Sequence, residues 1–145
     1  MNNPLDSKLS QNLGLLLARV PLGAFLLLHG YHFIHVGVSE FVNTNRAAVE
    51  HYLPALAASI FLHALPFVEV AAGAFLALGI FARIGGFLAS IVLLTAVGVF
   101  MGIAGSGNSP FNPFIIFFGL SVFLCCAGPG GISLDRYVWG RGKRA

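Results

Sequence analysis

Three ionisable side chains, Arg19, His29 and Glu69, stand inside long apolar segments and are the first candidates for chemistry in this chain. An ionisable group surrounded by hydrocarbon is costly to keep charged, so such residues usually face a cavity or pair with one another. A carboxyl group in this setting pairs with a cation or stays neutral and donates a hydrogen bond, which suits a proton relay or a quinone head group. We therefore take Glu69, His29 and Arg19 as the candidate catalytic residues.

The positions of these residues along their helices predict which of them meet. We count about 1.5 Å of rise per residue from Leu13 for the first helix and from Ala82 for the second. On this scale His29 lies about 24 Å deep and Glu69 about 20 Å, whereas Arg19 lies only about 9 Å deep. The partner of Glu69 is therefore expected to be His29 first and Arg19 second, with the long stem of Arg19 reaching upward.

A second group of polar residues is predicted nearer the outer face. His32 and His63 both lie about 28 Å from the inner edge on different helices, as two axial ligands of a haem b would. Asn108 and Asn112 belong to the turn-rich stretch GSGNSPFNP, which we expect to close over the same end. These four residues are the candidate cofactor-binding residues, with haem b or a metal ion at the two histidines as the alternative to a quinone.

A structural role is the competing interpretation of the same side chains. Glu69 would then be half of a buried clamp with Arg19 or His29, and His63 would bond a backbone carbonyl. Polar side chains within spans also hold helices together, at about 0.6 to 2 kcal/mol each. We prefer the structural interpretation for any single histidine and the functional one for Glu69.

The elements that carry these residues are predicted to be membrane-spanning helices. From Ile84 to Leu134 the chain has no Asp, Glu, Lys or Arg, and 57% of all its residues are hydrophobic against 9% charged. About 20 apolar residues cross the hydrocarbon core of a bilayer, so this run holds two spans and the whole chain has room for four. The chain is predicted to be all-α, with residues 1–145 forming one domain, a four-transmembrane-helix bundle. The expected spans are residues 12–36, 56–82, 84–104 and 112–127.

The remaining segments are expected to be short and interfacial. Residues 37–54 mix charged and apolar side chains, which predicts an interfacial loop or a short surface helix. The first apolar segment is too long for a signal peptide and lacks a small-residue cleavage pattern, so we expect it to be retained. Cys125 and Cys126 are expected to be buried free thiols, because adjacent cysteines rarely form a strain-free disulfide.

The basic residues predict the orientation. With four spans, one side of the membrane would carry only Arg46, and the other would carry Lys8, Arg83, Arg136, Arg141, Lys143 and Arg144. Basic residues near span ends stay in the cytoplasm, so both termini are expected there, in a multi-pass protein of the bacterial inner-membrane type. Membrane lipids are expected partners, whereas nucleic acid is not, because no basic face is predicted outside the membrane.

Three stretches resemble segments of a known family: RVPLGAFLLLHG (Arg19–Gly30), EVAAGAFLALGIFARIGG (Glu69–Gly86) and GPGGISLDRY (Gly128–Tyr137). They are similar to the DoxX family of small four-helix membrane proteins, which is similar in turn to the membrane subunit of thiosulfate:quinone oxidoreductase. Family members often carry a Lys shortly after the His-Gly pair, where this chain has His32. The resemblance implies a membrane-embedded, redox-associated protein that works with a quinone or with soluble oxidoreductase partners.

Three functional hypotheses follow. The first is a quinone-linked or otherwise redox-associated role, with Arg19, His29 and Glu69 around one pocket. The second is a haem b or metal-binding protein that uses His32 and His63. The third is an accessory structural subunit of a larger membrane complex. Whether the chain is an enzyme stays open at this point, and a nucleotide site is not expected, because no Gly-rich phosphate loop follows a strand.

Overall fold

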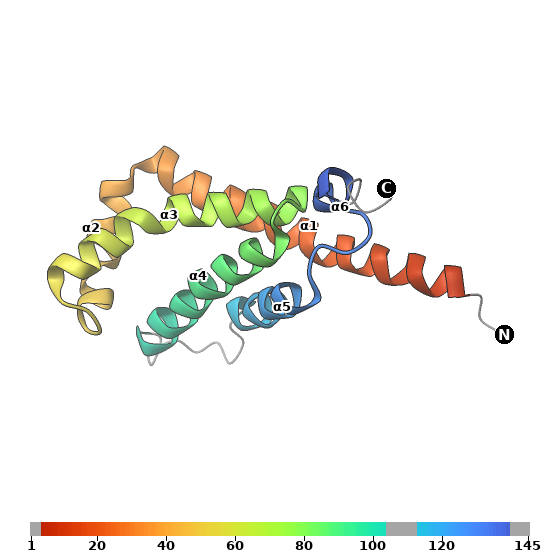
Figure 1. Cartoon of the computed structure of the whole chain (residues 1–145). Helices are drawn as coiled ribbons and strands as arrows, with labels where there is room; N and C mark the ends of the chain where they lie inside the picture. Colours follow the sequence, from red (N-terminus) through yellow and green to blue (C-terminus); the bar gives the residue numbers. More distant parts are fainter. Residues whose placement is uncertain (1–3, 104–112, 140–145) are drawn as a thin grey trace.

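The part of the chain that the structure describes is helical throughout. The structure is a computed structural model, which describes residues 4–103 and 113–139. Its helices are α1 (Pro4–Val36), α2 (Val38–Glu50), α3 (Ala55–Leu78), α4 (Ala82–Ile103), α5 (Pro113–Ala127) and α6 (Leu134–Trp139) (Figure 1). The predicted all-α class is confirmed for these residues, which contain no strand.

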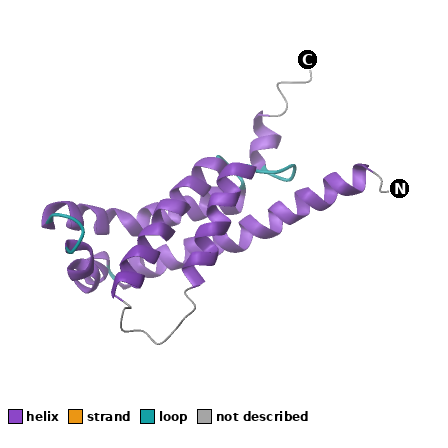
Figure 2. Cartoon of the chain, turned by 90° about the horizontal axis from the view of Figure 1, so that it is seen from below, coloured by secondary structure: helices purple, strands orange, loops and turns teal. Residues whose placement is uncertain are grey.

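The four longest helices, α1, α3, α4 and α5, overlap the four segments predicted to be spans, although α3 ends at Leu78, four residues before the predicted end of the second span. Helix α1 begins eight residues earlier than the predicted span. The start of the apolar residues marks where a span enters hydrocarbon, but a helix can begin before that point. The first turns of α1 extend beyond the other helices (Figures 1 and 2). The apolar parts of α1, Lys8–Val36, and of α3, Ala55–Leu78, are long enough to cross a membrane, whereas those of α4 and α5 are shorter.

Close packing of backbones joins α1 to α3 and α4 to α5, and α3 also contacts α4. A Cβ atom added at Gly73 would lie 2.6 Å from the carbonyl oxygen of Gly23, so α1 and α3 touch through their main chains. A Cβ atom at Gly86 would lie 2.8 Å from the backbone nitrogen of Cys125. Small residues allow this approach, which matters where burial of apolar surface brings no gain over lipid.

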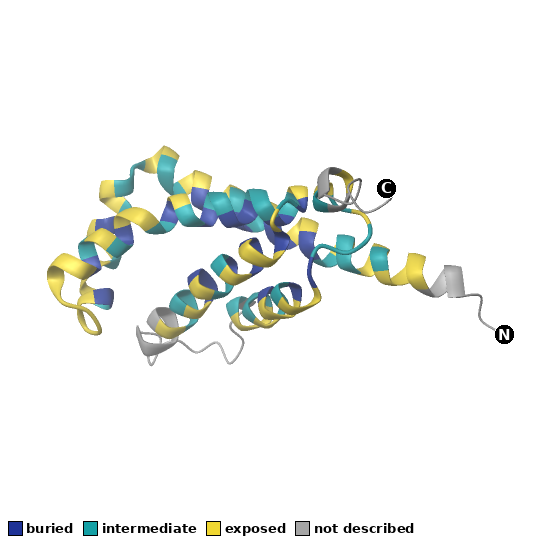
Figure 3. Ribbon diagram, viewed as in Figure 1, coloured by how far each residue is buried: buried dark blue, intermediate teal, exposed yellow. Residues whose placement is uncertain are grey.

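A single apolar core lies between these four helices. It consists of Leu22, Leu26, Ala72, Leu76, Ala89, Val92, Leu93 and Leu124. Large apolar side chains also cover the outside of the bundle, where Leu17, Leu28 and Leu56 are each more than 60% exposed (Figure 3). Water would make such a surface a liability, whereas the hydrocarbon of a bilayer solvates it.

Helix α2 packs against the first turns of α3. Gly37, with φ of 122°, reverses the chain between α1 and α2 in a conformation that a side chain would strain. Val42 and Val49 on one face of α2 are buried against Ala58 and Leu62 of α3. The helical form of the short surface segment predicted over residues 37–54 is thereby confirmed, and its placement on the membrane surface stays a prediction.

The adjacent cysteines lie on α5 as free thiols. Cys125 is half-buried, but Cys126 is exposed. The prediction of free thiols is confirmed, while that of burial is wrong for Cys126 and only partly met for Cys125.

Candidate functional site

His29 of α1 and Glu69 of α3 meet across the interface between the two helices. The distance between His29 Nδ1 and Glu69 Oε2 is 2.9 Å. Gly30 makes the contact possible, because a Cβ atom there would lie 2.6 Å from the carbonyl oxygen of Pro66 and 2.8 Å from Glu69 Cβ. The Glu69 side chain is 6% exposed and that of His29 is 33% exposed. The predicted partner of Glu69 is therefore confirmed as His29.

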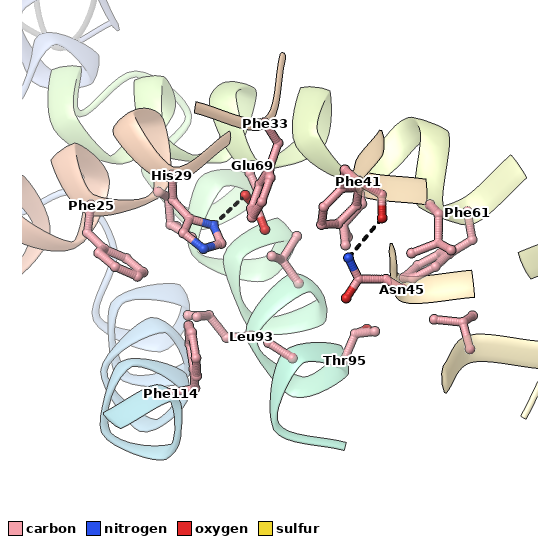
Figure 4. Close-up of a pocket in the computed structure, with 16 residues that line it drawn as sticks. Phe25, His29, Phe33, Phe41, Asn45, Phe61, Glu69, Leu93, Thr95 and Phe114 are labelled. Carbon is pink, nitrogen blue, oxygen red and sulfur yellow. Dashed lines mark hydrogen bonds and ion pairs between the residues drawn. The ribbon is translucent and has the colours of Figure 1, made fainter. Parts of the chain in front are cut away.

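Aromatic rings fix the orientation of the imidazole. Phe25, one turn before His29, stacks on it with ring centroids 5.4 Å apart and an angle of 24° between the planes. Phe33, one turn after, meets it edge-on at 4.8 Å and 90°. Phe114 of α5 closes a third side at 6.4 Å. With Nδ1 held by Glu69, the second ring nitrogen, Nε2, is turned toward the side of the cavity where Leu93 and Phe114 lie (Figure 4).

The cavity beside this pair is narrow: it spans about 650 Å³ when its open mouth is counted, but only about 80 Å³ of that is interior free space. Its walls come from helices α1 to α5 and are formed by Phe25, Leu26, His29, Phe33, Phe41, Asn45, Val49, Phe61, Leu62, Leu65, Glu69, Val92, Leu93, Thr95, Ala96 and Phe114. Apolar walls with a few convergent polar groups are the usual composition of small-molecule sites.

Two further polar side chains stand on the wall opposite the pair. Asn45 Nδ2 donates to the carbonyl of Phe41 at 2.8 Å, and the amide oxygen is turned away from that bond (Figure 4). Thr95 Oγ1 donates to the carbonyl of Ile91 at 2.9 Å. Asn45 keeps its amide oxygen and one N–H, and Thr95 keeps the lone pairs of its hydroxyl oxygen, so both side chains can still accept a hydrogen bond.

The contribution of α2 to the pocket was not foreseen from the sequence. Phe41, Asn45 and Val49 line the cavity from successive turns of α2. Their spacing of four residues places them on one face of a helix, and this was the signal available in the sequence. It does not say which neighbour that face meets, so the pattern alone could not assign these residues to the site.

Arg19 is not part of this pocket. The residue is buried, at 3% exposed, and its guanidinium donates to the carbonyls of Pro129 and Ile132. The expectation that Arg19 shares a site with His29 and Glu69 is not met, because ten residues of helix separate it from His29 by about 15 Å. The carbonyls of residues 129 and 132 are nearer partners.

Arg19 belongs to an assembly that we call the Arg19 clamp, formed by Asn12, Arg19, Gly79, residues 128–132 and Asp135. Gly131 N–H donates to Asn12 Oδ1 at 2.6 Å. The Asp135 carboxylate accepts from the N–H groups of Phe81 at 2.9 Å and Ala82 at 3.3 Å, which caps the start of α4. The clamp thus joins α1, the turn between α3 and α4, and α6. The GPGG segment therefore has a structural role in this assembly.

The structure does not bring His32 and His63 together. Both are exposed; the His32 ring contacts Phe33, and His63 Nδ1 donates to the carbonyl of Ser59 at 2.7 Å. His32 lies two residues beyond Gly30, about 200° around α1 from the side that faces α3. The structural interpretation of His63, a bond to a backbone carbonyl, is therefore confirmed.

The other cofactor candidates lie elsewhere or outside the described residues. Asn108 and Asn112, in the stretch expected to close over the outer end, fall outside residues 4–103 and 113–139. Among the residues that are described, no group of three or more His, Cys, Asp or Glu is placed to hold a metal ion.

A comparison of the sequence with known families agrees with the resemblance of its first two motifs. The sequence model of the DoxX family matches residues 14–102, more than half of the chain. The chain belongs to the DoxX family. In this DoxX protein the matched region contains Arg19, His29 and Glu69, whereas the Gly128–Tyr137 segment lies beyond it. No curated protein and no solved structure matches the chain.

Proposed function

We propose that this DoxX-family membrane protein binds a quinone at the His29–Glu69 pair and supports its reduction or oxidation together with a partner oxidoreductase. One observation carries the proposal: an imidazole bonded to a buried carboxylate stands in an aromatic, almost wholly apolar pocket. A quinone head group is a flat ring with a hydrogen-bonding oxygen at each end. The pocket offers rings for stacking and polar groups on opposite walls.

The pair can match both redox states of such a ligand. Because the Nδ1–H group of His29 is directed at Glu69, Nε2 is the nitrogen available to a ligand. A protonated imidazole donates from Nε2 to a quinone carbonyl, and a neutral one accepts from a quinol hydroxyl. Glu69 stabilises the charged form and holds the neutral form in the tautomer with hydrogen on Nδ1.

Reduction of the quinone requires one external donor of electrons. A partner oxidoreductase, soluble or membrane-bound, supplies two electrons to the quinone. One proton passes from His29 Nε2 to the nearer carbonyl oxygen, so that an N–H bond breaks and an O–H bond forms. The second proton reaches the other oxygen from water at the open mouth of the pocket. Quinol oxidation reverses each step, with Nε2 as the proton acceptor.

We also infer a four-span arrangement in the cell membrane, of the bacterial inner-membrane type. The exposed apolar side chains of α1, α3, α4 and α5 support it, as do the two helices of full span length. In this arrangement α2 lies at the outer surface, and the pocket opens near that surface and faces the lipid that stores quinones.

The test measures quinone binding and stability for the same variants. The variants are Glu69→Gln, His29→Gln and their combination, in nanodiscs, with His63→Gln as a control because His63 lies outside the pocket. We expect His29→Gln and the double variant to weaken binding of a benzoquinone at least tenfold, and His63→Gln to leave it unchanged. Glu69→Gln should weaken binding while the fold persists, because the Gln oxygen still accepts from Nδ1–H.

A purely structural pair would give the opposite pattern. Removing one partner of a buried pair would then cost of the order of 3 to 5 kcal/mol. If Glu69→Gln loses thermal stability, the double variant regains it and quinone binding never changes, the pair is a clamp and the proposal is wrong.

A further inference from the structure

A second hollow adjoins the pocket and opens at the side of the bundle. We call it the side groove; Val49, Tyr52, Leu53, Phe61, Thr95 and Gly98 line it, and its volume is about 810 Å³ including open space. Val49, Phe61 and Thr95 also line the pocket, so the two hollows are neighbours that share these walls. The groove lies beside the pocket, between the α2–α3 connection and α4.

The lining of the groove is mostly apolar. None of its six lining residues is charged. Tyr52 and Leu53 leave large apolar surfaces exposed at its mouth, at 58% and 39% exposed. The only polar side-chain groups in its lining are the hydroxyls of Tyr52 and Thr95, so a charged ligand would lose its hydration here without gaining a charged partner, and the walls favour an apolar chain.

Gly98 has no side chain, so the α4 wall does not project into the groove at this position. Gly98 is exposed, and no described atom lies within 4 Å of the position that a Cβ atom would take there. A bulky side chain at this position would project from the wall of the groove without meeting neighbours first. Residue 98 therefore controls how much room a chain has as it leaves the pocket.

We propose that the side groove holds the hydrocarbon tail of the quinone whose head group binds His29, so that the natural ligand is a long-tailed, lipid-resident quinone. This inference rests on the proposed function, and it adds the class of substrate and its route. Inside a bilayer, a tail gains little by leaving lipid for an apolar groove, because both surroundings are hydrocarbon. The groove is thus a passage for the tail and only a weak source of affinity.

The experiment compares two quinones with the same head group, one without a side chain and one with a four-isoprene tail. Gly98→Phe fills the groove, and Gly119→Phe is the matched control, because Gly119 is also an exposed helical glycine with no described atom within 4 Å of its Cβ position. We expect Gly98→Phe to weaken binding of the tailed quinone at least tenfold in nanodiscs. Binding of the tailless quinone should stay within twofold, and Gly119→Phe should affect neither.

Other outcomes would overturn the inference. Equal loss of both quinones in Gly98→Phe would mean that residue 98 acts on the head-group pocket, and no loss of either would mean that the tail lies elsewhere. Failure of the unchanged protein to bind either quinone would overturn the proposed function as well.

A second measurement serves if Gly98→Phe does not fold. A quinone with a diazirine at the end of its tail should label residues 49–53 and 95–98 of the unchanged protein. Labelling confined to other segments would contradict the tail route. So would labelling of the groove by a phospholipid diazirine that the tailed quinone does not displace.

Discussion

Two ionisable side chains of α1 are removed from water in different ways. Arg19 is buried beside the backbone carbonyls of residues 129 and 132, to which Nη1 and Nη2 donate, while its buried Nε has no hydrogen-bond partner among the described residues. His29 has one nitrogen committed to Glu69, and the other faces a cavity. The terminal nitrogens of Arg19 are used by the backbone and hold structure together, whereas the His29 imidazole has a nitrogen that faces a cavity and can meet a ligand. The same difference decides which of the two belongs to the site.

Substitution of Arg19 should therefore affect stability and not ligand binding. Arg19→Gln leaves two part-buried carbonyls without charged donors, and we expect a loss of about 2 to 4 kcal/mol in unfolding free energy, measured by denaturant titration in detergent. Arg19→Lys should recover only part of it, because a single ammonium cannot reproduce the guanidinium fork. Arg46→Gln, which removes an exposed pair with Glu50, should change stability by less than about 1 kcal/mol. Unchanged stability with lost quinone binding in Arg19→Gln would return Arg19 to the site.

At the scale of helices, the contact between α1 and α3 positions the pair, and its closeness depends on glycine. In Gly73→Ala the new Cβ would lie 2.6 Å from both Gly23 O and Leu27 N, so the helices must separate. We expect a loss of at least about 2 kcal/mol, although alanine alone favours a helix by about 1 kcal/mol. Gly119→Ala, which meets nothing, should be neutral or stabilising. Equal unfolding midpoints for the two variants would show that the helices do not touch at Gly73.

The helices also show how far the sequence could predict the site. Rise along a helix depends only on residue number, so the shared level of His29 and Glu69 follows from their positions in the chain. The direction of a side chain around the axis depends on packing, which is why His32 and His63 share a predicted level but do not meet. Arg19 was misplaced for another reason: its partners are main-chain carbonyls in a distant loop, and carbonyls have no side-chain signature in a sequence.

At the scale of the whole molecule, the Arg19 clamp holds together the segments at one end of the bundle. Contacts of Asn12 with Gly131 and of Asp135 with Phe81 bring the first part of α1, the α3–α4 turn and α6 together, with α2 at the opposite end (Figure 1). If that end is cytoplasmic, as the basic residues predict, a cytoplasmic reporter fused after Ala145 should be active and one fused after Asn45 inactive. The reverse pattern at both positions would overturn the proposed topology.

The clamp also has a consequence for biosynthesis. The carbonyl partners of Arg19 are 110 and 113 residues further along the chain, so they do not exist when α1 first enters the membrane. Until they are made, the guanidinium must stay near headgroups or water, because an unpaired charge in hydrocarbon costs at least about 2.5 kcal/mol at the centre of a span. We therefore expect the first helix to reach its final depth only after residues 128–132 have been made, and a ribosome stalled before residue 128 to leave α1 shallow and exposed to quality-control proteases.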